Sequence, residues 1–69
     1  MARITMISLK IHPGDQKSVH FKSLANAQQW LNLNSFESFS AYVFCADGKN
    51  HRKVGLKYTG EFVDWVKSL

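Results

Sequence analysis

The stretch VHFKSLANAQQWL, residues 19–31, decides the fold because its hydrophobic period changes in the middle. Val19 and Phe21 alternate with polar neighbours, as in a half-buried strand. After Ser23 the apolar residues recur at helical spacing, at Leu24, Ala27, Trp30 and Leu31. Ser23 suits an N-cap, because its hydroxyl can accept a hydrogen bond from a free amide of the first turn. The stretch predicts a strand that leads directly into a helix anchored by Trp30.

A similar alternation precedes this stretch. Residues 4–11 form a β-branched run whose core-facing positions are Thr5, Ile7, Leu9 and Ile11. The turn residues of HPGDQK, residues 12–17, join this run to the strand before the helix. The first two elements therefore read as a hairpin.

The second half repeats the layout. We expect a third strand over residues 39–46, a turn at DGKN, and a fourth strand at RKVGLKY with Val54 and Leu56 facing inward. Thr59 is expected to cap a final helix. Its apolar stripe is Phe62, Trp65, Val66 and Leu69.

The predicted order is ββαββα in one domain, 1–69, made of two ββα pseudo-repeats at about 1–34 and 35–69. Trp65 lies 35 residues after Trp30, and the inward positions of the halves share this offset. The identities are too few to claim a duplication. Each unit alone is too small to bury its apolar face, so the two are expected to pack side by side.

Strand order follows from the charges. The second and fourth strands carry outward Lys and His side chains, whereas the first and third carry apolar residues on both faces. Charged strands belong at the edges, where they discourage pairing with other chains. This favours an antiparallel α+β sheet of order 2-1-3-4 with both helices on one face. The alternative is a circularly permuted ferredoxin-like order, 1-2-4-3.

Composition sets limits on location and partners. A chain of 69 residues has a marginal core, and its net charge of +4 permits an anionic partner without requiring one. The single cysteine, Cys45, excludes an internal disulfide and favours a reducing compartment, the cytoplasm. Polar residues interrupt every apolar run, which argues against a membrane span.

Alternation leaves one face of the sheet bare, with an apolar centre and a basic rim. The residues assigned to it are Ile4, Met6, Ser8, Lys10, His12, His20, Lys22, Phe39, Ala41, Val43, Cys45, Lys53, Gly55 and Lys57. Large exposed apolar patches usually mark interaction sites. The alternative is that NLNSFES, residues 32–38, folds over this face or that a bulge breaks the alternation.

Specific catalytic and metal signatures are missing from the sequence. His12, His20, His51 and Cys45 are the only soft ligands, and no pair has zinc-site spacing. The five acidic residues are scattered, and so small a core leaves little room for a catalytic pocket. We expect no enzymatic activity, no metal, no cofactor and no small-molecule substrate.

The favoured function is binding to another protein, or to a second copy of the chain, as a regulator or inhibitor. The predicted contact residues are Ile4, Met6, Lys10, His20, Lys22, Phe39, Val43 and Lys57. Val43→Lys is then expected to abolish association and keep the fold. The small size is also typical of inhibitors encoded by phages or mobile elements.

The alternative is a nucleic-acid-binding module. In it Phe39 would stack on bases, and the phosphates would contact Lys49, Arg52, Lys53 and Lys57. The aromatic-rich strand of an RNA recognition motif is missing from the predicted face, which offers Phe39 as its one ring.

Overall fold

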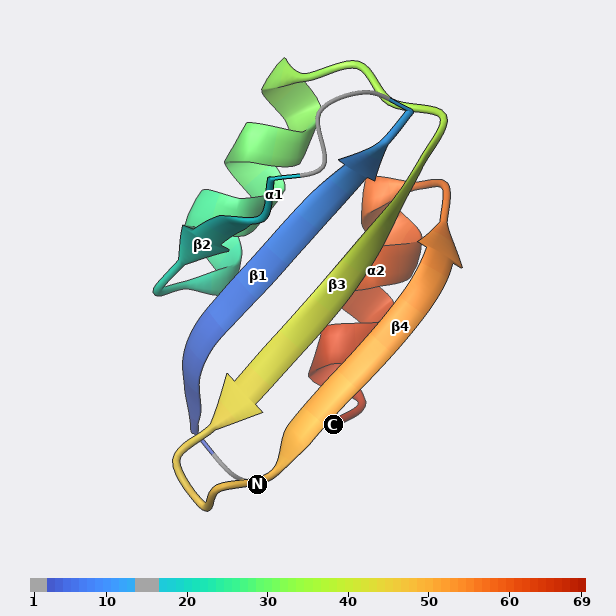
Figure 1. The fold of residues 1–69 in the computed structure, drawn as a ribbon. Helices are drawn as coiled ribbons and strands as arrows, with labels where there is room; N and C mark the ends of the chain where they lie inside the picture. The colour runs from blue at the N-terminus through green and yellow to red at the C-terminus, as the bar shows by residue number, and fades with distance from the viewer. Residues whose placement is uncertain (1–2, 14–16) are drawn as a thin grey trace.

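The computed structural model describes residues 3–13 and 17–69. Its elements are β1 (Ile4–His12), β2 (Val19–Phe21), α1 (Leu24–Leu33), β3 (Ser38–Cys45), β4 (Asn50–Leu56) and α2 (Thr59–Lys67). The sheet is antiparallel with the order β2-β1-β3-β4, as predicted, and the ferredoxin-like alternative is not observed. In Figure 1 the two helices lie behind the sheet, α1 beside β2 and β1, and α2 beside β3 and β4.

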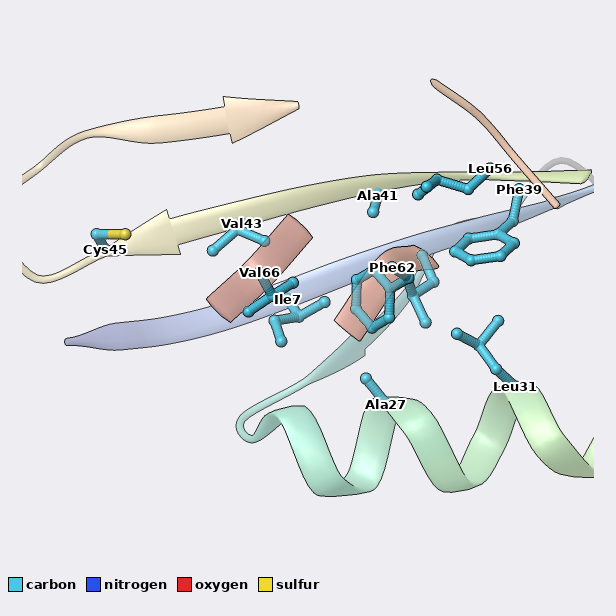
Figure 2. Close-up of a cluster of buried hydrophobic side chains, with 11 residues drawn as sticks. Ile7, Ala27, Leu31, Phe39, Ala41, Val43, Cys45, Leu56, Phe62 and Val66 are labelled. Carbon is cyan, nitrogen blue, oxygen red and sulfur yellow. The ribbon is translucent and has the colours of Figure 1, made fainter. Parts of the chain in front are cut away.

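One hydrophobic core joins the sheet to both helices. Its buried members are Ile7, Leu9, Ala27, Leu31, Phe39, Ala41, Val43, Cys45, Leu56, Phe62 and Val66. Side chains of β1 and β3 project toward the helices, as Figure 2 shows. Because α1 and α2 contribute to the same cluster, they cover the same face of the sheet, and the other face carries no helix.

The helix ends match the sequence in part. Ser23 caps α1 as predicted, and its Oγ accepts a hydrogen bond from the Asn26 amide at 3.2 Å. Trp30 packs on Phe21 with ring centroids 5.6 Å apart, which pins α1 to β2. The predicted cap of α2 was wrong: Thr59 is the first helical residue, and Tyr58 before it makes no side-chain cap.

The phase of β3 is opposite to the prediction. Phe39, Ala41 and Val43 are 0% exposed and lie under the helices. They oppose Ile11, Leu9 and Ile7 of β1, which set the core-facing phase. Cys45, also predicted on the bare face, belongs to the same core.

The cause of this error is the composition of β3. SFSAYVFC has apolar side chains in both phases, so hydrophobic alternation alone does not choose between them. Applied to the strands, the offset of 35 residues assigns to β3 the opposite phase to the one observed. On the helices, where Ala27 corresponds to Phe62 and Leu31 to Val66, the offset gives buried positions in both halves.

Two irregularities shift single residues between faces. Near Ile4 the β1–β3 register changes, so Ile4 opposes Cys45 and packs against the core instead of lying on the bare face. A second shift lies between Phe39 and Ala41, opposite Gly55, whose φ is +72°. It leaves Val54 59% exposed while Leu56 is buried, although both were predicted inward.

Gly55→Ala is expected to lower the free energy of unfolding by about 1–2 kcal/mol, because an L-residue is strained at positive φ. A Cβ at this position would meet no atom within 4 Å, so the cost is conformational. Urea unfolding measures it. Gly60→Ala is the matched control: in the first turn of α2, with equal space around it, alanine should stabilise the protein. Equal changes in the free energy of unfolding for the two variants would contradict a requirement for glycine at position 55.

Candidate functional site

The face of the sheet without helices is called the open face below. Residues directly opposed in neighbouring strands project from the same side of a sheet, so the register assigns its members. They are Met6, Ser8, Lys10, His12, His20, Ser38, Ser40, Tyr42, Phe44, Asn50 and Arg52. Val54 follows Arg52 by two residues on β4, is exposed and is placed with them. Figure 1 looks onto this face.

A row of four residues crosses the open face from one edge to the other. His20 of β2 opposes Ser8 of β1, Ser8 opposes Tyr42 of β3, and Tyr42 opposes Arg52 of β4. Neighbouring strands lie about 4.8 Å apart, so the row spans roughly 14 Å. A tyrosine ring therefore stands between a guanidinium on one side and a serine with an imidazole on the other.

The adjacent row places a second ring beside the first. Phe44 follows Tyr42 by two residues on β3, which separates their Cα atoms by about 7 Å on one face. Met6 of β1 and Asn50 of β4 oppose Phe44 on its two sides. Both rings are half-buried among their neighbours. The open face thus carries two aromatic rings in line on a central strand.

Serine–histidine contacts lie beside these rings. Ser8 Oγ is 2.6 Å from His20 Nδ1, and Ser40 Oγ is 3.3 Å from His12 Nε2. Ser8 is 4% exposed, so the hydroxyl sits low between longer side chains. Because a hydroxyl can donate or accept, each contact fits either tautomer of the ring. The contacts hold both imidazoles against the sheet.

The charges on the open face have one sign. Among the described residues, the four strands contain no Asp or Glu, and the open face carries Lys10, Arg52 and two histidines. Acidic residues occur in the connections and in α2, at Glu37, Asp47, Glu61 and Asp64. Asp15 lies outside the described residues. The open face is therefore suited to an anionic ligand.

The predicted protein-contact residues divide between two sides of the sheet. Met6, Lys10 and His20 lie on the open face, as expected. The placement of Ile4, Phe39 and Val43 on this face was wrong, because all three pack on the helix side. The exposed Lys22 and Lys57 follow the ends of β2 and β4 and are not in the sheet.

The residues of the nucleic-acid alternative are likewise divided. Arg52 lies on the open face, but Phe39 is a core ring and cannot stack on a base. Lys53 is exposed and opposes Ala41, which puts it on the helix side of the β4 edge. Lys49 lies in the turn after β3, where its amide donates to Asp47 Oδ1.

Sequence reasoning missed Tyr42 and Phe44, the two rings of the open face. A signal was available in β3, because one phase of SFSAYVFC contains three hydroxyl groups and the other contains none. Hydroxyls on Ser38, Ser40 and Tyr42 favour the solvated side of a strand. Polar content, rather than hydrophobic content, distinguishes the two faces of β3.

The part of the chain that the structure describes contains no group of three or more His, Cys, Asp or Glu side chains that could hold a metal ion, and no detectable pocket. Within residues 3–13 and 17–69, neither helix has the length and apolar character needed to cross a membrane. Comparison with protein-family models, curated proteins and solved structures found no match to this chain. Function is therefore inferred from the open face itself.

Proposed function

We propose that the protein binds single-stranded nucleic acid on the open face, without catalysis. The observation that carries this proposal is the pair Tyr42 and Phe44, two rings in line on a central strand, with Arg52 directly opposite Tyr42. Bases stack on such rings with about 1–3 kcal/mol each, and cationic side chains follow the phosphates. Nucleic acid is the alternative ligand predicted from the sequence, but the stacking rings are Tyr42 and Phe44 instead of Phe39.

The spacing of the rings supports a single strand as the ligand. Two Cα atoms about 7 Å apart allow consecutive unpaired bases to stack one on each ring. Lys10 opposes Ser40, which precedes Tyr42 by two residues on β3, whereas Phe44 follows Tyr42 by two residues. Cationic side chains therefore lie beside Tyr42, at Arg52, and in the next row, at Lys10. The bases of a duplex are already stacked and paired, and their faces are not available to these rings.

A protein partner, favoured by the sequence, is less well supported. Its predicted apolar centre included Ile4, Phe39 and Val43, which pack on the helix side. On the open face, Met6 and Val54 are the aliphatic residues among rings, hydroxyls and basic groups. A cytoplasmic location remains part of the proposal, because the lone thiol of Cys45 suits a reducing compartment.

Fluorescence anisotropy with labelled oligonucleotides tests the proposal. The probes are oligothymidine and oligouridine of about ten nucleotides, each with a duplex of equal length, titrated at several salt concentrations. We expect the single strands to bind more tightly than the duplexes, with affinity that falls as salt rises. Failure of every probe to bind at low salt would overturn the proposal and return a protein partner to first place.

Arg52→Ala is expected to flatten the salt dependence of single-strand binding. The slope of log affinity against log salt should fall in magnitude by about 0.7, the value for one phosphate contact on a single strand. Lys53→Ala is the matched control, because it removes the same charge from the next residue, on the other side of β4. Equal changes in slope for the two variants would place the ligand elsewhere.

A further inference from the structure

The three histidines of the chain lie on different sides of the sheet. His12 and His20 belong to the open face, each within reach of a serine hydroxyl of a central strand. His51 is half-buried and opposes Val43, so it projects on the helix side at the edge of the sheet. His12 and His20 can therefore contact a ligand bound on the open face, whereas His51 cannot.

We infer that the open face binds nucleic acid together with protons, which are taken up by His20 and His12, so that affinity rises as the pH falls. The inference rests on the proposed function and adds a means of regulating it. Histidine changes charge between about pH 5 and pH 8, within the range that cells and their compartments use. A modest acidification would then strengthen binding.

The environment of His20 favours this coupling. Its neighbours on the open face are Ser8, directly opposed, and Lys10, two residues further along β1. The Ser8 hydroxyl can accept from a protonated ring, which leaves His20 Nε2–H free to donate to a phosphate oxygen. The described residues of β1 and β2, and those of α1, which packs against β2, include no carboxylate that could balance the added charge. Lys22, two residues after His20, is a further exposed cation. A phosphate supplies that balance.

The environment of His12 is similar but includes one acidic residue. His12 lies near Ser40 and two residues from Lys10, and its carbonyl accepts a hydrogen bond from the Glu37 amide at 2.9 Å. His12 is half-buried whereas His20 is exposed, so a phosphate can approach the His20 ring more readily. The larger share of ligand-linked proton uptake is therefore assigned to His20.

The coupling is reciprocal. A ligand that binds the imidazolium form more tightly than the neutral form promotes protonation, and protonation strengthens binding by the same factor. The direction is fixed by charge: the phosphate is an anion, and protonation adds a positive charge beside it. Affinity is therefore expected to be higher at low pH than at high pH.

Anisotropy titrations with oligothymidine, at constant ionic strength and between about pH 5.5 and pH 8, measure this effect. Thymine does not titrate in this range, so a change in affinity reports on the protein. We expect about a tenfold gain at the lower pH. His20→Gln should remove most of the gain, and adding His12→Gln should remove the remainder. Glutamine keeps a hydrogen-bonding group in each place.

His51→Gln is the matched control, because it removes a histidine from the other side of β4. It should keep the full pH dependence. Binding that is independent of pH, or a pH dependence that disappears with His51→Gln and persists in the double variant, would overturn the inference and leave the proposed function intact. The absence of oligothymidine binding at every pH would overturn both. Unfolding midpoints of all variants, measured at both pH values, separate this coupling from a change in stability.

Discussion

Val43→Lys should unfold the protein, whereas Tyr42→Lys, one residue earlier, should leave it folded. Val43 is 0% exposed and opposes Ile7 beneath the helices, so a lysine there would bury an unpaired ammonium or force the core apart. Tyr42 points to the open face, where a lysine head group can reach water. The expected loss for Val43→Lys is about 4 kcal/mol or more, a large part of the stability of a small domain.

Circular dichroism and urea unfolding compare the two variants directly. The sequence-based expectation was that Val43→Lys would keep the fold, so this substitution distinguishes the two possible phases of β3. A folded Val43→Lys together with an unfolded Tyr42→Lys would mean that Tyr42, and not Val43, faces the core. Val43→Ala provides a milder test: it should remain folded with a loss of about 2–3 kcal/mol, as expected for a cavity in a tight core.

Tyr42→Ala and Phe44→Ala should each weaken single-strand binding by about 5- to 150-fold, the equivalent of one stacked base. The half-buried rings lie outside the core cluster, so loss of either should cost binding more than stability. Tyr42→Phe should keep most of the affinity, because stacking needs the ring and not the hydroxyl. The measurement is anisotropy with oligothymidine at fixed salt and pH.

Tyr58→Ala is the control for removal of an aromatic side chain. Tyr58 is 72% exposed and lies between β4 and α2, outside the sheet. Its removal should leave affinity unchanged. If Tyr58→Ala weakens binding as much as Tyr42→Ala does, stacking on the open face is not the source of the affinity. Unaltered binding in both Tyr42→Ala and Phe44→Ala would exclude this mode.

The sequence predicted the architecture because each element had a distinct signal. The change of period around Ser23 predicted α1 and its cap, and charged side chains predicted which strands lie at the edges. Hairpin connections were recognisable from turn residues. These signals depend on residues close together in the chain, and the order β2-β1-β3-β4 follows from them without detailed knowledge of packing.

The candidate site was harder to predict because it depends on the phase of one strand. A shift of one residue exchanges the two faces, so the error in β3 exchanged Tyr42 and Phe44 for Val43 and Phe39. Ile4 was misplaced by a bulge, which inserts a residue without a clear mark in the sequence. On β1 and β2, where polar residues occupy one phase, Lys10 and His20 were placed correctly.

The separation of charge in the fold has a kinetic consequence. The open face carries Lys10 and Arg52 and none of the described acidic residues, whereas Glu61 and Asp64 lie on α2, behind the sheet. If the protein binds a polyanion as proposed, this asymmetry would orient the open face toward the ligand before contact. Encounters would then begin in a favourable orientation, and added salt would slow association more than it hastens release.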